Sequence, residues 1–197
     1  MEITFDPRHT AVLALDCQSG IISVYVKPES DFTEGCSKVL DAARNAGTTV
    51  IHVRVEFRPG LPEVSDRNKF FAAIKASKPH QEFFQGSSGA IHPALGPKPE
   101  DIVVVKHRVS AFAGTDLDMI LRSREISTLV LFGVSTSGAV LGTFVDASDA
   151  DYRVVVIEDC CADLELELHS ALIKSLFPTR ADVTSAEDLV TALKSLP

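Results

Sequence analysis

Apolar runs alternate with amphipathic stretches along most of the chain. Short apolar or β-branched runs, typical of buried strands, occupy residues 10–16, 48–57, 101–107, 128–133 and 152–159. Apolar residues recur at helical spacing in residues 37–47, 115–126, 135–151 and 164–177. Residues 181–196 predict a short last strand and then a helix capped by Ser185. The pattern therefore predicts strands and helices in alternation.

This alternation predicts the fold class. Strands separated by helices form βαβ units, which place a parallel sheet between two layers of helices. We expect an α/β fold with a three-layer, doubly wound, mostly parallel six-stranded sheet and helices on both faces. We expect a single domain over residues 1–197. Residues 58–100 are rich in Pro, Gly and Ser and predict an irregular segment, which in a compact domain is often a functional loop or lid.

Composition narrows the classes of function. The net charge of −8 argues against binding nucleic acid or an anionic membrane, since both need clustered Lys and Arg. No run is long and apolar enough to span a bilayer, and the N-terminus shows no standard signal peptide. The four cysteines fit neither a zinc pattern nor a disulfide framework, so we expect small buried thiols. We expect a cytoplasmic protein whose partner is a small-molecule substrate.

Candidate chemistry lies at the predicted strand ends, because ligands bind beyond the carboxyl ends of parallel strands. Asp16 ends the first strand, Lys106 the third, and Asp159 the fifth. Desolvation at a strand end raises the pKa of an aspartate unless a cation lies close. An Asp16–Lys106 pair could hold a proton-transfer carboxylate and an anionic substrate. A plain salt bridge that ties two strand ends together is the alternative.

The segment "GVSTSGAV", residues 133–140, has small residues where a strand becomes a helix. Free backbone N–H groups at a helix N-terminus can bind an anion or an oxyanion. The alternative is an ordinary connection capped by Ser135, Thr136 or Ser137. The chain shows no G-x-G-x-x-G or P-loop motif, and this turn is not a G-x-S-x-G elbow.

Three segments, in order, resemble the isochorismatase-like hydrolase superfamily, also called the cysteine hydrolases. They are "AVLALDCQSG" with Asp16, "VVKHRVSAFAGTDLDMIL" with Lys106, and "LVLFGVSTSGAVLGTFVDASDADYRVVVIEDCCAD". The resemblance covers nearly the whole chain and implies catalytic roles for Asp16 and Lys106. It also implies a cis peptide bond at Val134–Ser135 and a homodimer or homotetramer.

The chain departs from the family pattern at one decisive position. Amidase members of the family carry their nucleophile in a G-x-x-T-x-x-C pattern. When this pattern is aligned with Gly133 and Thr136, its cysteine position falls on Ala139. An alanine side chain cannot attack a carbonyl. The family's Asp-x-His metal motif is also missing after the second strand. We expect no metal and no cofactor.

The resemblance also indicates a chemistry that needs no thiol. True isochorismatases lack the cysteine and cleave a vinyl ether, releasing pyruvate without a covalent intermediate. Asp16 would be the general acid, protonated through a raised pKa, and Lys106 would bind substrate and balance charge. Expected substrate-binding residues are Phe112, Val134, Ser135, Gly138 and Arg54. Core packing is the alternative for Phe112, as it is for Phe57, and a surface role is the alternative for Arg54, Arg58, His107 and Arg108.

Three hypotheses follow. The first is a non-covalent isochorismatase, or a related hydrolase of a small cyclic acid, acting by general acid catalysis. The second is an amidase of the nicotinamidase or carbamoylsarcosine amidohydrolase type whose cysteine is replaced by Ala139. The third is a non-catalytic small-molecule-binding protein that keeps Asp16 and Lys106 as structure. We favour the first, because vinyl-ether chemistry permits loss of the thiol while the aspartate and the lysine remain.

Overall fold

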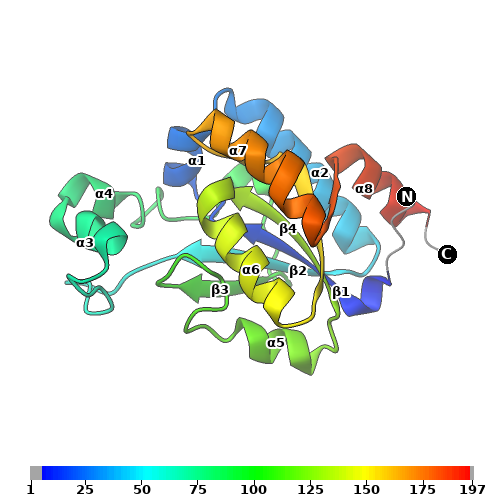
Figure 1. Cartoon of the computed structure of the whole chain (residues 1–197), viewed down its shortest axis with the longest axis horizontal. Coiled ribbons are helices and arrows are strands. Elements are labelled where there is room, and N and C mark those ends of the chain that lie inside the picture. Colours follow the sequence, from blue (N-terminus) through cyan, green and yellow to red (C-terminus); the bar gives the residue numbers. More distant parts are fainter. Residues whose placement is uncertain (1–5, 196–197) are drawn as a thin grey trace.

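The computed structural model describes residues 6–195, which contain one six-stranded sheet (Figure 1). Its strands are β1 (Thr10–Leu15), β2 (Thr49–Val55), β3 (Ile102–Lys106), β4 (Thr128–Val134), β5 (Arg153–Ala162) and β6 (Asp182–Thr184). The spatial order is β3-β2-β1-β4-β5-β6, and each neighbouring pair is parallel. The predicted parallel sheet is confirmed.

Helices cover both faces of this sheet. They are α1 (Ser19–Tyr25), α2 (Glu29–Asn45), α3 (Lys69–Ala76), α4 (Lys78–Glu82), α5 (Leu117–Ser123), α6 (Leu141–Asp149), α7 (Leu166–Ala171) and α8 (Ala186–Lys194). Helices α2 and α8 pack against each other on one face, and α5 and α6 lie on the other (Figure 1). The three-layer, doubly wound arrangement is therefore confirmed. No helix among residues 6–195 is long and apolar enough to cross a membrane.

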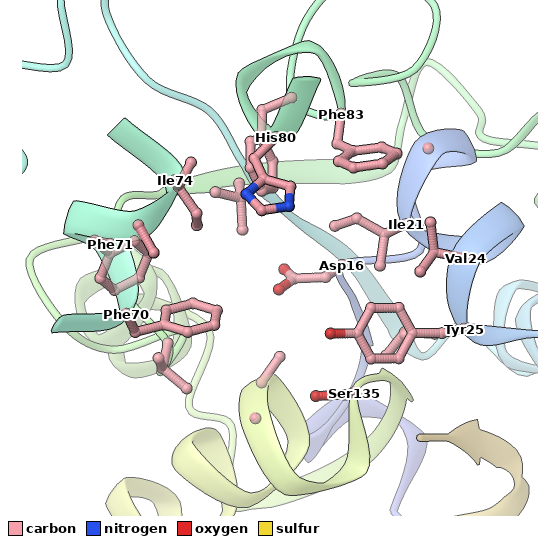
Figure 2. A pocket seen from close by; sticks show the side chains of 18 of the residues that line it. Asp16, Ile21, Val24, Tyr25, Phe70, Phe71, Ile74, His80, Phe83 and Ser135 are labelled. Atoms are coloured by element: carbon pink, nitrogen blue, oxygen red, sulfur yellow. The ribbon is translucent and has the colours of Figure 1, made fainter. Parts of the chain in front are cut away.

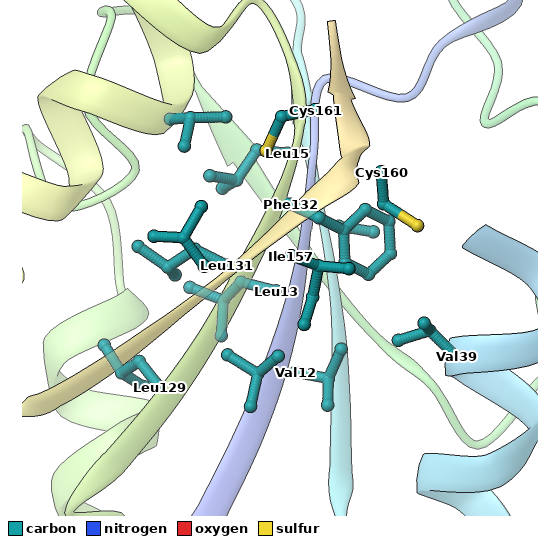
Figure 3. Packing of buried hydrophobic residues seen from close by; sticks show 14 of the residues in the cluster. Val12, Leu13, Leu15, Val39, Leu129, Leu131, Phe132, Ile157, Cys160 and Cys161 are labelled. Carbon is teal, nitrogen blue, oxygen red and sulfur yellow. The ribbon is translucent and has the colours of Figure 1, made fainter. Parts of the chain in front are cut away.

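The main core lies where the central strands meet the helices (Figure 3). All six residues of β1 are buried, because helices cover this strand on both sides. Its Leu13 is in register with Leu131 of β4, and both are fully buried. Each such side chain contributes about 1.5–3 kcal/mol by leaving water. All four cysteines are free and buried, as predicted.

Two predicted boundaries are wrong. Helix α2 begins at Glu29 instead of residue 37, because Phe32 and Cys36 extend its buried face. Strand β5 continues to Ala162, because Cys160 and Cys161 are both buried within the sheet. Asp159 therefore lies inside the strand, where it accepts a hydrogen bond from the Ala186 N–H at 2.8 Å and anchors α8.

The segment predicted as irregular, residues 58–100, contains α3 and α4. A small second core holds it together, with Phe57 and Phe84 packed against Leu61, Val64, Phe71 and Ile74. Figure 1 shows α3 and α4 standing apart from the helices that cover the sheet. The prediction missed these helices because their apolar residues serve this small core.

Candidate active site

The structure brings Asp16 and Lys106 together across the end of β2. Asp16 directly follows β1 and Lys106 ends β3, the two neighbours of β2 in the sheet. The Lys106 Nζ lies 2.8 Å from Asp16 Oδ2. The Lys106 side chain is 1% exposed and that of Asp16 is 9% exposed. The predicted pair is therefore formed, and both of its side chains are almost fully shielded from solvent.

The backbone around Asp16 fixes the direction of its carboxyl group. Asp16 has a positive φ of 52°, and its N–H donates to the carbonyl of Val53 at 2.9 Å. Gln18, two residues later, is fully buried. Its amide accepts from the Val55 N–H at 2.7 Å and donates to the carbonyls of Val55 and Gly89. Gln18 thus ties the end of β1 to β2, a role that the sequence analysis missed.

The environment of Asp16 favours its acid form. Burial raises the pKa of Asp16, and the Lys106 ammonium lowers it by less. The Oδ1 atom is buried and has no hydrogen-bond partner, so the ionised form is stabilised by a contact at Oδ2 alone. A raised pKa is the property that a carboxyl group needs in order to act as a general acid.

Asp16 and Lys106 face a cavity of about 700 Å³ (Figure 2). Four residues of the predicted turn also line it: Val134, Ser135, Gly138 and Ala139. The remaining walls come from α1 and from the segment that carries α3 and α4. The cavity therefore lies at the carboxyl ends of the strands, as expected for this class of sheet.

The turn after β4 approaches β1 very closely. The Val134–Ser135 peptide bond is cis, as the family resemblance implies. Gly133 has a φ of 136°, and a Cβ there would lie 2.0 Å from the carbonyl oxygen of Leu15. The N–H of Ser137 donates to Asp163 Oδ2 at 2.7 Å, and that of Gly138 donates to the Ser135 carbonyl. These two N–H groups are therefore not available to an anion.

Ala139, for which the sequence pattern predicts the nucleophile position of the amidases, lines the cavity and is 4% exposed. The four cysteines, all of which the structure describes, are buried outside the cavity lining. Burial raises the pKa of the Cys17 thiol, the one adjacent to Asp16 in the chain, well above its usual range. A buried, protonated thiol away from the cavity cannot serve as the missing nucleophile.

Two expected substrate-binding residues lie outside the cavity. Phe112 packs against the main core, with its ring centroid 6.1 Å from that of Tyr152. Arg54 donates to Glu56 Oε2 at 2.6 Å, whereas the next residue of β2, Val55, lines the cavity. Successive side chains of a strand point to opposite faces, so Arg54 points away. Neither residue lines the cavity that Asp16 and Lys106 face.

The other basic side chains considered from the sequence already have partners within the protein. Arg58 pairs with Glu63, and His107 donates to the carbonyl of Glu56 at 2.6 Å. Arg108 lines the cavity, but its guanidinium donates to the backbone carbonyls of His107 and Glu63.

Tyr25 is a candidate that the sequence did not indicate. Figure 2 shows its hydroxyl group pointing into the cavity, on the side of Asp16 and Ser135. Burial raises the pKa of Tyr25, and the negative charges of Asp163 and Asp16 raise it further. The phenol therefore stays protonated and can donate a hydrogen bond to a bound ligand.

Comparison with known families shows to which family the chain belongs. The family model described as "Isochorismatase domain" matches residues 10–188. The chain belongs to the isochorismatase family. This isochorismatase-family hydrolase is 30% identical to the uncharacterized isochorismatase family protein YecD of Escherichia coli O157:H7, over 97% of the chain and 100% of that protein. It is 26% identical to a maleamate amidohydrolase of Pseudomonas putida, over 96% of the chain and 89% of that protein.

Solved structures of the family share the fold. An isochorismatase family protein from Burkholderia thailandensis is 30% identical, with a TM-score of 0.82 and 98% of each chain covered. An N-carbamoylsarcosine amidase from Thermoplasma acidophilum is 26% identical, with a TM-score of 0.74 over 90% of this chain and 96% of that one.

Proposed function

We propose that this hydrolase cleaves the vinyl ether of isochorismate, or of a related small cyclic acid, and releases pyruvate by general acid catalysis. The observation that carries the proposal is the environment of the Asp16 carboxyl group. This carboxyl group has a raised pKa and lines a cavity in which Ala139 stands where a nucleophilic thiol would otherwise be. A site that keeps its acid and lacks a nucleophile is suited to a reaction without a covalent intermediate.

The reaction needs one proton donor and one water molecule. Asp16 transfers its proton to the terminal carbon of the enol ether, and the ether carbon becomes an oxocarbenium ion. Water adds to that carbon and loses a proton, which restores the acid form of Asp16. The resulting hemiketal breaks its bond to the alcohol oxygen and leaves pyruvate and the alcohol. Lys106, 2.8 Å from Asp16, stabilises the carboxylate while it lacks its proton.

An amidohydrolase is the second candidate, because two relatives carry amidohydrolase or amidase names. The argument against this candidate is the lack of an activated nucleophile in the cavity. Ser135 lines the cavity, but a serine needs an adjacent base, and the nearby Asp16 carboxyl group already pairs with Lys106. A protein that binds a small molecule without catalysis is the third.

A pair of assays separates these candidates. Pyruvate release from isochorismate is followed through lactate dehydrogenase, and ammonia release from maleamate and from nicotinamide is followed in parallel. We expect pyruvate and no ammonia. Ammonia release by the native protein, or by Ala139→Cys in the absence of any pyruvate release, would favour the amidohydrolase. A folded protein that is silent in all assays would favour the binding protein.

A further inference from the structure

Two apolar walls face each other across the cavity (Figure 2). Helix α1 contributes Ile21 and Val24 to one wall, with Phe83 beside Ile21, and the opposite wall includes Phe70, Phe71 and Ile74. Behind this second wall, the ring of Phe57 packs edge-on against those of Phe71 and Phe84, with centroids 5.9 and 5.5 Å away. The position and shape of the aromatic wall are therefore fixed by packing.

These walls remain partly uncovered. Eight large hydrophobic side chains are exposed in the described part of the chain, and four of them line this cavity: Val24, Phe70, Val109 and Leu164. Phe70 is 60% exposed. Exposed apolar surface that gathers in a concave site is typical of a binding site for an apolar group.

Positive charge in the cavity is scarce. Lys106 is held by Asp16 and by the carbonyl of Val109, to which it donates at 2.5 Å. The Arg108 guanidinium donates to two backbone carbonyls and lies 5.7 Å from the Phe71 ring centroid. Lys69 and His80 also line the cavity but are exposed to solvent.

Charge balance then limits the number of anionic groups on the substrate. When Asp16 is in its acid form, the Lys106 ammonium can balance one carboxylate. A second carboxylate, placed on the ring of the substrate, would lie between the apolar walls and away from Lys106. The other basic residues of the lining are Arg108, which is bonded to two carbonyls, and Lys69 and His80, which are exposed to solvent. Burying an unpaired carboxylate costs several kcal/mol.

From these observations we propose that the substrate carries one carboxylate and a hydrophobic ring, and that the ring binds between α1 and the segment that carries α3 and α4. This inference rests on the proposed function. Within it, the inference favours a related cyclic acid with one carboxylate over isochorismate, which carries a second carboxylate on its ring. The substrate class is then an enol ether of pyruvate with a hydrophobic alcohol or phenol. Hydrolysis consumes one water molecule and yields pyruvate and the free alcohol or phenol.

Two synthetic substrates test this class directly. 2-Phenoxyacrylate has one carboxylate and an apolar ring, and 2-(4-carboxyphenoxy)acrylate is the same molecule with a second carboxylate on the ring. We expect kcat/KM for pyruvate release to be at least about tenfold higher for 2-phenoxyacrylate. Equal values, or a preference for the dicarboxylate, would overturn the inference.

Binding of unreactive analogues separates this inference from the proposed function. 2-Phenoxypropanoate and 2-(4-carboxyphenoxy)propanoate lack the vinyl group, and their affinities can be measured by isothermal titration calorimetry. We expect the monocarboxylate to bind at least about tenfold more tightly. Tight, selective binding without pyruvate release from 2-phenoxyacrylate would support the ring site and contradict the proposed reaction.

A matched pair of variants tests the position of the ring. Phe70→Ala should weaken binding of 2-phenoxypropanoate by about fivefold, because it removes part of the apolar wall. Met119→Ala removes a side chain of similar exposure, 66%, from α5, outside the cavity. It should leave binding unchanged. Equal affinities of the two variants would place the ring elsewhere and overturn the inference.

Discussion

Asp16 combines two properties that usually exclude each other in an aspartate. It lies 2.8 Å from a lysine ammonium, yet its pKa is raised. Desolvation outweighs the attraction of Lys106 because the carboxyl group is buried and its Oδ1 atom has no hydrogen-bond partner. At the scale of single residues, this balance supports the proposed role of Asp16 as a proton donor.

The pH dependence of activity should report this balance. In the proposed mechanism the acid form of Asp16 is the active one, so kcat/KM for pyruvate release should fall as the pH rises through its raised pKa. Lys106→Met should move this descending limb to higher pH, since the ammonium lowers the pKa. Pyruvate release measured across the pH range checks both expectations. A rate that increases with pH, or a limb that moves to lower pH in Lys106→Met, would contradict the role of Asp16.

Sequence reasoning could find the residues at strand ends and the turn after β4, but not the walls of the cavity. Asp16 and Lys106 stand out as charged residues that close buried strands. Tyr25 and Phe70 carry no such signal, because their role depends on where α1 and α3 lie in space. Nothing in a sequence says whether an aromatic ring after a strand packs inward or faces a cavity, and Phe112 takes the core packing that the sequence analysis gave as its alternative.

At the scale of elements, a buried charged cluster joins α2, β2 and the start of β3. Arg44 of α2 donates twice to Asp101, at 3.1 and 2.7 Å, and His52 Nε2 of β2 lies 3.2 Å from the same carboxylate. The side chains of His52 and Asp101 are 1% and 2% exposed. Burial raises the pKa of Asp101, but the Arg44 guanidinium and the Lys98 N–H hold it below its usual value.

Asp101→Asn should destabilise the fold by about 3 kcal/mol, because it leaves Arg44 without its buried counter-ion. Urea unfolding gives the free energy of unfolding. Asp118→Asn is the control, since Asp118 pairs with Arg122 on the exposed side of α5 and its loss should cost less than about 0.5 kcal/mol. Equal effects of the two substitutions would show that the buried cluster adds no more than a surface pair.

Gly133→Ala should destabilise the fold by at least about 3 kcal/mol, because its Cβ would meet the Leu15 backbone and its φ of 136° is strained for alanine. Gly35→Ala, in α2, is the control: its Cβ would lie 3.5 Å from Cys160 Sγ, an ordinary contact. Because alanine favours a helix, that substitution should be neutral or stabilising by up to about 1 kcal/mol. Thermal unfolding of both variants measures the difference, and a tolerated Gly133→Ala would contradict the close contact between β4 and β1.

The strands were predictable as elements because continuous burial leaves continuous apolar runs. The ends of the strands were harder to predict. The end of β5 was predicted at Asp159, since a charged residue usually marks the surface, but the strand continues through two buried cysteines. Helices α3 and α4 were missed because Pro, Gly and Ser around them conceal short helices that bury few residues.

At the scale of the whole molecule, the cavity lies between two hydrophobic cores of unequal size. The main core spans the sheet, whereas the core under α3 has only Leu61, Val64, Phe71 and Ile74 as buried members. The layers of the fold follow from the alternation of strands and helices. The second core could not be predicted, because it forms only once residues 57–84 fold back on themselves.

Amide hydrogen exchange should reveal the difference in size between the two hydrophobic cores. The amides of α3 should exchange faster than those of α2, because fewer buried contacts resist local opening. Saturating 2-phenoxypropanoate should slow exchange in α3 and leave α2 unchanged. Equal protection of α2 and α3 without ligand would contradict the view that the wall of the cavity is the less stable part.

The most direct test of the central claim compares pyruvate release by the native protein and by Asp16→Asn, with 2-phenoxyacrylate and isochorismate as substrates. Circular dichroism and binding of 2-phenoxypropanoate would establish that the variant is folded and its cavity intact. We expect Asp16→Asn to lower kcat by about 10²- to 10⁴-fold, the usual contribution of a general acid. A folded Asp16→Asn variant that releases pyruvate at nearly the native rate would contradict general acid catalysis by Asp16.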